Sequence, residues 1–148
     1  MRNQSKNKVT IVGLSIFILS LFFNAFTVED MGKIKNYTSF EVFLIGPVSF
    51  LGGAGKEFLV WTANIWFLIS LFCVFKKYHL ASFITGTVAF VISGSFIFLE
   101  EILAAENGRI ARIYSLDAGY FLWLASILFI TLSAGYLRIV NKKDAHSE

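Results

Sequence analysis

The stretch FLVWTANIWFLISLFCVF, from Phe58 to Phe75, contains 18 residues and no charged side chain. An α-helix rises about 1.5 Å per residue, so about 20 apolar residues cross a hydrocarbon core about 30 Å thick. Three further uncharged runs of 20 residues occur at 9–28, 80–99 and 118–137. Because every backbone polar group must be paired inside lipid, helices are the natural form for these runs. The sequence therefore predicts an all-α fold, a bundle of four transmembrane helices.

The composition agrees with helices that face lipid. Of 148 residues, 56% are hydrophobic and 16% are charged, whereas soluble domains carry about 25% charged residues. The length predicts one domain over 1–148. A single cysteine, Cys73, excludes an intramolecular disulfide, and two histidines are too few for a histidine-built zinc or haem site. We expect no metal and no cofactor, and the small net charge of +3 argues against a nucleic-acid partner.

The distribution of basic residues predicts the orientation. The first run is longer than the apolar core of a signal peptide and ends in Phe-Thr-Val-Glu-Asp, so we expect a retained helix. With the N-terminus inside, the cytoplasmic pieces hold eight basic residues: Arg2, Lys6, Lys8, Lys76, Lys77, Arg138, Lys142 and Lys143. The exterior pieces hold five: Lys33, Lys35, Lys56, Arg109 and Arg112. Since basic residues favour the cytoplasmic side, both termini are predicted to be cytoplasmic.

The connection between the first two runs contains a further apolar segment. Residues 40–51, FEVFLIGPVSFL, are too few to span a membrane, and Gly46-Pro47 interrupts them. Such a segment is typical of a helix in the interface or of a re-entrant turn. We expect it at the outer membrane surface, broken near Gly46-Pro47 and followed by a Gly-rich hinge.

Small residues recur four positions apart in the inner halves of two runs. Ser82 and Gly86 lie in the third run, and Thr131 and Gly135 lie in the fourth. Residues at this spacing share one face of a helix, and small side chains let helices approach closely. We expect helix contacts at these positions.

A candidate ligand site follows from the polar residues inside the runs. No charged residue lies there, which argues against an ion-coupled transporter. Asn24 and Asn64 lie roughly 6 Å and 9 Å below the exterior surface at 1.5 Å per residue. We expect them to converge on an exterior cavity that is completed by Trp61, Trp123 and one of two acids, Glu100 or Glu101.

Each of these residues also suits a purely structural role, and the sequence leaves both possibilities open. The two asparagines suit hydrogen bonds between helices. The tryptophans suit the aromatic belt at a membrane interface or helix packing. The paired acids suit a solvated helix end, and because adjacent helical residues diverge by about 100°, both acids cannot easily face one ligand. No catalytic residue is predicted.

Two short motifs carry a resemblance to a known group of proteins. Trp61-Thr62-Ala63-Asn64 lies in the second run, and the stretch from Gly119 to Ser126, GYFLWLAS, lies in the fourth. With Gly46-Pro47 and Gly52-Gly53, this order resembles a group of small bacterial four-helix membrane proteins of no known activity. A proline often follows Ala-Asn in that group, and Ile65 takes its place here. The resemblance implies a bacterial cytoplasmic membrane and no particular activity.

The sequence favours a non-enzymatic membrane protein that binds a partner protein or a lipid through its exterior face. One alternative is a lipid-modifying or lipid-handling enzyme, or its accessory subunit, that uses Glu100 or Glu101 with Asn64. Another is a membrane immunity protein against a bacterial toxin. An enzyme needs convergent polar groups in a cavity that water can reach, so the surroundings of these residues discriminate between the classes.

Overall fold

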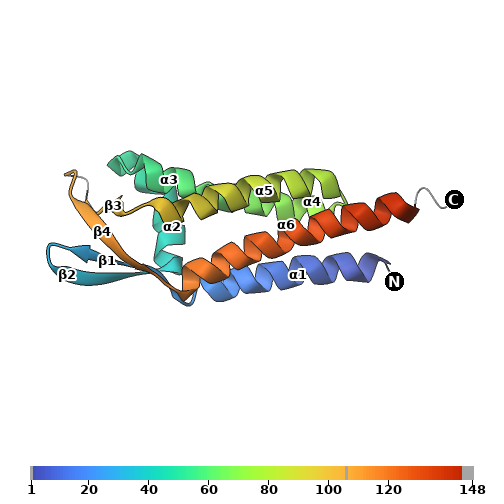
Figure 1. Ribbon diagram of the computed structural model, residues 1–148, viewed down its shortest axis with the longest axis horizontal. Coiled ribbons are helices and arrows are strands. Elements are labelled where there is room, and N and C mark those ends of the chain that lie inside the picture. The colour runs from blue at the N-terminus through green and yellow to red at the C-terminus, as the bar shows by residue number, and fades with distance from the viewer. Residues whose placement is uncertain (1, 106, 145–148) are drawn as a thin grey trace.

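The computed structural model describes residues 2–105 and 107–144, with side chains over 8–105 and 107–142. Four long helices run side by side: α1 (Arg2–Ser20), α4 (Ala63–Phe75), α5 (His79–Ser95) and α6 (Ala118–Asp144). A four-stranded sheet lies at one end of this bundle, where α1 ends and α6 begins (Figure 1). The first residues of α1 and the last of α6 lie together at the opposite end.

Among the described residues, three stretches are long and apolar enough to cross a membrane. They comprise 21, 20 and 25 residues: Gly55–Phe75, His79–Phe98 and Ala118–Lys142. The first joins α3 (Gly55–Trp61) to α4 through Thr62, and the second joins α5 to the 3₁₀ turn η2 (Phe96–Phe98). The apolar part of α1, Lys8–Ser20, is shorter. The chain is thus mostly helical, and its helices match three of the four predicted runs in length.

The sheet contradicts the all-α prediction. Its four antiparallel strands lie in the order β2-β1-β4-β3. They are β1 (Asn24–Asp30), β2 (Lys33–Thr38), β3 (Glu101–Leu103) and β4 (Ile110–Leu116). The two hairpins come from the two long connections, and β1 pairs with β4 to join them. That pairing joins segments far apart in the chain, so the sequence of either connection by itself does not predict it.

The sheet also shortens the first predicted helix. The uncharged run 9–28 is helical only to Ser20, and its last five residues, NAFTV, form the start of β1. Phe26 and Val28 are buried there, at 7% and 0% exposure. A buried central strand reads as continuous apolar sequence, so hydropathy alone does not distinguish it from the last turns of a membrane helix.

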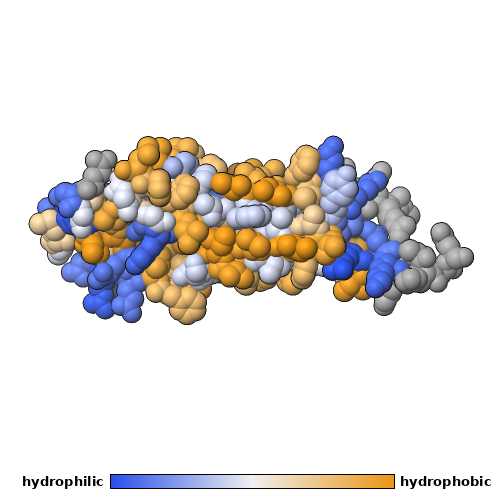
Figure 2. Space-filling model, turned by 90° about the horizontal axis from the view of Figure 1, so that it is seen from above, coloured by the Kyte–Doolittle hydropathy of each residue, from blue (hydrophilic) through white to orange (hydrophobic). Residues whose placement is uncertain are grey.

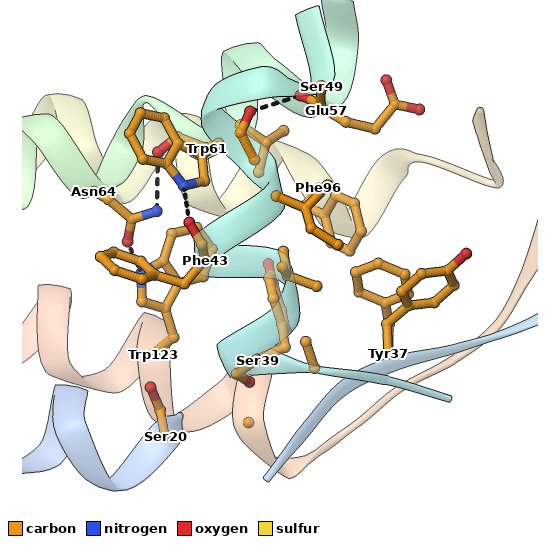
Figure 3. Close-up of a pocket in the computed structure, with 18 of the residues that line it drawn as sticks. Ser20, Tyr37, Ser39, Phe43, Ser49, Glu57, Trp61, Asn64, Phe96 and Trp123 are labelled. Carbon is orange, nitrogen blue, oxygen red and sulfur yellow. Dashed lines mark hydrogen bonds between the residues drawn. The ribbon is translucent and has the colours of Figure 1, made fainter. Parts of the chain in front are cut away.

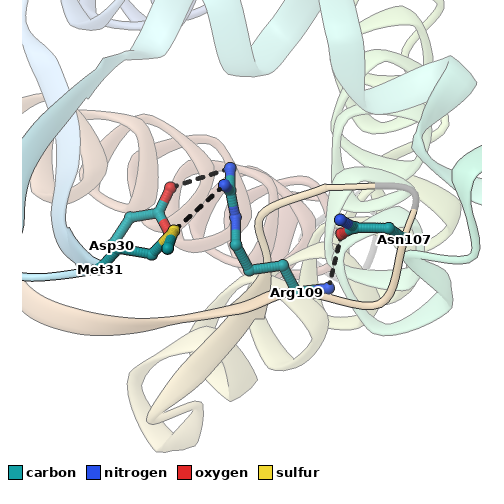
Figure 4. A network of polar contacts seen from close by, with 4 residues as sticks. All are labelled: Asp30, Met31, Asn107 and Arg109. Atoms are coloured by element: carbon teal, nitrogen blue, oxygen red, sulfur yellow. Dashed lines mark hydrogen bonds and ion pairs between the residues drawn. The ribbon is translucent and has the colours of Figure 1, made fainter.

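Polar contacts tie the sheet together at its tip and at its base. At the tip, the Arg109 guanidinium pairs with the Asp30 carboxylate at 3.1 Å and contacts the Met31 sulfur at 3.5 Å (Figure 4). At the base, the Asp117 carboxylate accepts hydrogen bonds from Thr27 at 2.7 Å and Ser115 at 2.9 Å. Asp117 immediately precedes α6, so these bonds fix where β4 turns into the bundle.

The apolar segment 40–51 forms a helix, α2 (Ser39–Ser49), followed by the 3₁₀ turn η1 (Phe50–Gly52). Thr38 caps its N-terminus: the Thr38 hydroxyl accepts from the Glu41 N–H, and the Glu41 carboxylate accepts from the Thr38 N–H. The hydrogen bond from the Thr38 N–H lowers the pKa of the Glu41 carboxyl group, and a second bond from the Thr38 hydroxyl to the same carboxylate, at 2.9 Å, adds to this effect. The break expected near Gly46-Pro47 is not found, since the helix continues through Pro47 to Ser49.

Small residues bring α5 against its neighbours, which confirms the contacts expected at the small-residue pairs. A Cβ at Gly86 would overlap the Thr131 hydroxyl of α6 and would lie 3.0 Å from the Ser70 hydroxyl of α4. A Cβ at Gly135 would lie 3.2 Å from the Phe83 ring. Ser70 and Ser82 exchange hydrogen bonds with each other's backbone carbonyls at 2.8 and 2.9 Å. These bonds join α4 to α5 in the interior.

Two glycines of α5 provide a matched test of this packing. Gly86→Ala should lower the free energy of unfolding by about 1–3 kcal/mol, because the added methyl group overpacks the contact with Thr131. Gly94→Ala should leave it unchanged or raise it slightly, because no atom lies within 4 Å of a Cβ there and alanine is the better helix former. Thermal unfolding in detergent measures both. Equal melting temperatures for the two variants would contradict the close packing at Gly86.

Candidate functional site

A cavity lies between α2 and the sheet end of the helix bundle. Its volume is about 180 Å³, and it reaches the surface at Ile45, which lines it and is exposed. Figure 3 shows side chains that line it. Residues from α1, β1, β2, α2, α3, α4, η2, β3 and α6 line it. They are mostly apolar or aromatic, and the lining comprises Phe17, Ser20, Leu21, Ala25, Phe26, Tyr37, Ser39, Val42, Phe43, Ile45, Gly46, Ser49, Ala54, Glu57, Val60, Trp61, Asn64, Phe96, Leu103, Gly119, Tyr120 and Trp123.

Helix α2 covers this cavity because Trp61 of α3 binds its backbone. Pro47 has no N–H group, so the carbonyl of Phe43, four residues earlier, lacks its usual helical donor. The indole Nε1–H of Trp61 donates to that carbonyl at 3.0 Å. A Cβ at Gly46 would overlap the Trp61 ring, so only glycine allows the indole so close. Gly46-Pro47 is therefore a docking site for Trp61 within a continuous helix.

A second set of hydrogen bonds continues from Trp61 to α6. The Asn64 Nδ2 group donates to the Trp61 carbonyl at 3.0 Å, and the Trp123 Nε1–H donates to Asn64 Oδ1 at 2.9 Å. Figure 3 shows the three side chains together on one side of the cavity. We call Trp61, Asn64 and Trp123 the Trp–Asn–Trp chain. It connects α2, the α3–α4 junction and α6, and Asn64 is 6% exposed.

Other polar groups of the lining are also engaged in the fold. The hydroxyls of Ser20 and Ser49 donate to the carbonyls of Phe17 and Gly46, at 2.6 and 2.7 Å. The Glu57 carboxylate accepts from the Leu103 N–H at 2.7 Å, which links α3 to β3.

Ser39 differs from these groups. Its hydroxyl is buried and has no hydrogen-bond partner, and it lies against Gly119, where a Cβ would overlap it. Ser39 therefore leaves one polar atom of the lining without a partner inside the protein.

The structure brings three of the six predicted site residues together and separates the others. Trp61, Asn64 and Trp123 line the cavity, whereas Asn24 begins β1 and is not part of the lining. Glu101 is exposed in β3.

Glu100 precedes β3 and is also exposed, with its backbone carbonyl accepting from the Ile113 N–H at 2.8 Å. The acid of the lining is instead Glu57, which was not among the predicted site residues. The missed signal at the start of α2 was Thr38-x-x-Glu41, a capping-box pattern that places Ser39 in the first turn.

The opening of the cavity lies next to an apolar surface of α2. Ile45 lines the cavity and is also 55% exposed. Phe40, Leu44 and Val48, four residues apart, are exposed on the outer side of the same helix. An apolar chain lying against this stripe is therefore close to the opening.

The comparisons with known proteins add no assignment to this geometry. No family model, no curated protein and no solved structure matches the chain. Within the described residues, no group of three or more His, Cys, Asp or Glu side chains is arranged to hold a metal ion. The resemblance to small bacterial four-helix proteins stays a prediction.

The contact between Trp61 and α2 predicts a coupling between two substitutions. Trp61→Phe should lower the free energy of unfolding by about 1 kcal/mol or more, because the Phe43 carbonyl loses its donor. Pro47→Ala restores a backbone N–H to that carbonyl, so Trp61→Phe should cost less in the Pro47→Ala background. Unfolding of the four proteins in detergent gives the coupling energy. Strictly additive effects would show that the two residues do not share this carbonyl.

Proposed function

We propose that this chain is an integral protein of a bacterial cytoplasmic membrane, crossing the bilayer four times with both termini in the cytoplasm. α1 lies beside the three longer apolar stretches and is the fourth crossing in this proposal, with its shorter apolar part, Lys8–Ser20, extended by the polar first turns of the helix. Only 28–44% of those stretches is buried inside the protein. On the face that Figure 2 shows, hydrophobic residues dominate the middle of the molecule and the hydrophilic residues gather toward the two ends.

The charges at the two ends support this orientation. The end away from the sheet carries eight basic residues, Arg2, Lys6, Lys8, Lys76, Lys77, Arg138, Lys142 and Lys143, and the sheet end carries five, Lys33, Lys35, Lys56, Arg109 and Arg112. The described acidic side chains belong to the sheet, α2 and α3, or precede α6: Glu29, Asp30, Glu41, Glu57, Glu100, Glu101 and Asp117. The positive end suits the cytoplasm, which puts the sheet and α2 on the exterior side. The bacterial membrane follows from the resemblance of the sequence motifs.

The function that this geometry supports best is non-enzymatic binding of a membrane lipid through the exterior face, with one lipid tail in the cavity beneath α2. The observation that carries it is the apolar cavity opening beside the exposed stripe of Phe40, Leu44 and Val48. With the sheet outside, this stripe lies where the bilayer meets water, so the opening is within reach of lipid tails.

The size and the polar groups of the cavity limit what it holds. Sites for drug-sized ligands occupy about 300–1,000 Å³, so a cavity of about 180 Å³ accommodates part of one chain and not a whole lipid. The polar groups of the Trp–Asn–Trp chain hold helices together, which favours binding over catalysis.

The proposed orientation predicts the location of the two ends. A cytoplasmic fluorescent reporter fused after Glu148 should fluoresce in bacteria, and an alkaline phosphatase fused there should be inactive. The phosphatase inserted in the β3–β4 connection, after Asn107, should be active because that loop is exterior. An active phosphatase at the C-terminus would reverse the orientation.

The proposed lipid site predicts a selective effect of filling the cavity. A phospholipid with a photoactivatable diazirine near the tail end should label cavity residues of the wild-type protein in vesicles. Ala54→Phe should reduce this labelling several-fold, because Ala54 is 8% exposed and lines the cavity. Ala125→Phe, on the exposed side of α6, is the control and should retain the labelling. Labelling of the cavity that survives Ala54→Phe would refute the site.

A further inference from the structure

A second groove lies at the opposite end of the bundle, between the start of α5 and the end of α6. Its volume is about 330 Å³, and it is lined by Phe83, Gly135, Arg138, Ile139 and Lys142. Gly135 makes room for it: a side chain there would begin 3.2 Å from two carbons of the Phe83 ring. The floor is thus an aromatic ring and a glycine, and one rim is basic.

The two cations of this groove lie on one face of α6. Arg138 and Lys142 are four residues apart, so successive turns of the helix bring them side by side. Both are exposed, and no described carboxylate lies within 4.0 Å of either. Lys76 and Lys77, in the connection before α5, add positive charge at the same end of the bundle. This combination is complementary to an anion and repels a cation.

The length of α6 puts the cations and the apolar floor at different depths. About 20 helical residues cross the hydrocarbon core, so a helix that enters at Ala118 reaches the far boundary near Arg138. Lys142 lies about 6 Å further along the axis. Tyr136 and Tyr78 are 68% and 64% exposed near this level, as expected for aromatic residues at an interface. The basic rim therefore meets headgroups, and the floor of the groove meets acyl chains.

We infer that this groove binds an anionic phospholipid. The phosphate pairs with the Arg138 guanidinium, whose planar donors match phosphate oxygens, and with the Lys142 ammonium. An acyl chain of the same lipid lies over Gly135 against the Phe83 ring. The groove and its charge are features of the described chain, whereas the assignment to the cytoplasmic leaflet rests on the proposed topology.

A binding measurement with two lipids of equal chain length tests the site. Native mass spectrometry of the full-length protein in detergent compares bound phosphatidylglycerol with bound phosphatidylcholine. The double variant Arg138→Gln/Lys142→Gln should lose the preference for phosphatidylglycerol by about thirty-fold, or about 2 kcal/mol for two charges. The control is Lys76→Gln/Lys77→Gln, which removes two charges from the same end outside the groove and should keep most of the preference. Equal losses in both variants would show a general surface attraction and overturn the site.

A second variant tests the apolar half of the groove. Gly135→Leu keeps both cations but fills the space against Phe83, so it should reduce bound phosphatidylglycerol several-fold. Circular dichroism and thermal unfolding establish that each variant is folded. Should Gly135→Leu prove unstable, Ile139→Trp narrows the same groove from its exposed side and should have the same effect. Unchanged lipid binding in a folded Gly135→Leu or Ile139→Trp variant would overturn the acyl-chain contact.

Two further measurements separate lipid binding in this groove from binding of a free anion and from binding beneath α2. Inorganic phosphate at millimolar concentration should fail to displace the lipid, because it offers nothing to the apolar floor, and full displacement would assign the groove to a free anion. Ala54→Phe, which fills the cavity beneath α2, should leave the phosphatidylglycerol preference unchanged. If the cavity beneath α2 proves not to bind lipid, the test of the groove on α6 is unaffected. If the groove proves not to bind lipid, the test of the cavity is unaffected.

Discussion

The hydrogen bond from the Trp61 indole to the Phe43 carbonyl holds α2 over the cavity in this structure. Pro47 deprives that carbonyl of a helical donor, and a buried unpaired carbonyl is costly. Trp61 supplies the donor at 3.0 Å, and Gly46 leaves room for its ring. The bond adds to other contacts of α2, which include the Ser39 N–H donating to the Phe23 carbonyl at 2.9 Å and the Phe43 ring lying against Phe17. With this bond in place, α2 covers a cavity that it lines together with residues of the sheet and of the long helices.

The sequence predicted the long apolar helices well because their signal is local. Each of the three longer stretches is apolar over about the length of a membrane crossing, and the helices overlap the runs 58–75, 80–99 and 118–137. The prediction for the first run, 9–28, was wrong at its end, where NAFTV forms a strand. The sheet depends on the pairing of Phe26 with Leu116 and of Val28 with Ile113. Such pairing is set by contacts between distant segments, which neither composition nor periodicity encodes.

Only part of the candidate site could be predicted, because some of its residues depend on contacts between distant segments. Asn64, Trp61 and Trp123 were identified because polar and amphipathic residues inside apolar runs need partners, and the structure unites these three. Asn24 was placed with them by counting residues along a helix, but the helix ends at Ser20 and Asn24 begins a strand. Glu57 was missed because its partner, the Leu103 N–H, lies 46 residues away in a strand the sequence did not predict.

The sheet and the cavity are two consequences of one arrangement. Pairing of β1 with β4 holds the end of α1 beside the start of α6, and α1 packs more closely on α6 than on α4. At the sheet end α2 packs on α3, and Trp61 and Phe43, which share a hydrogen bond, line the cavity beneath it. At the opposite end, Gly86 and the paired serines bring α4, α5 and α6 into close contact. The same bundle therefore combines close packing among α4, α5 and α6 with a cavity beneath α2 at the sheet end.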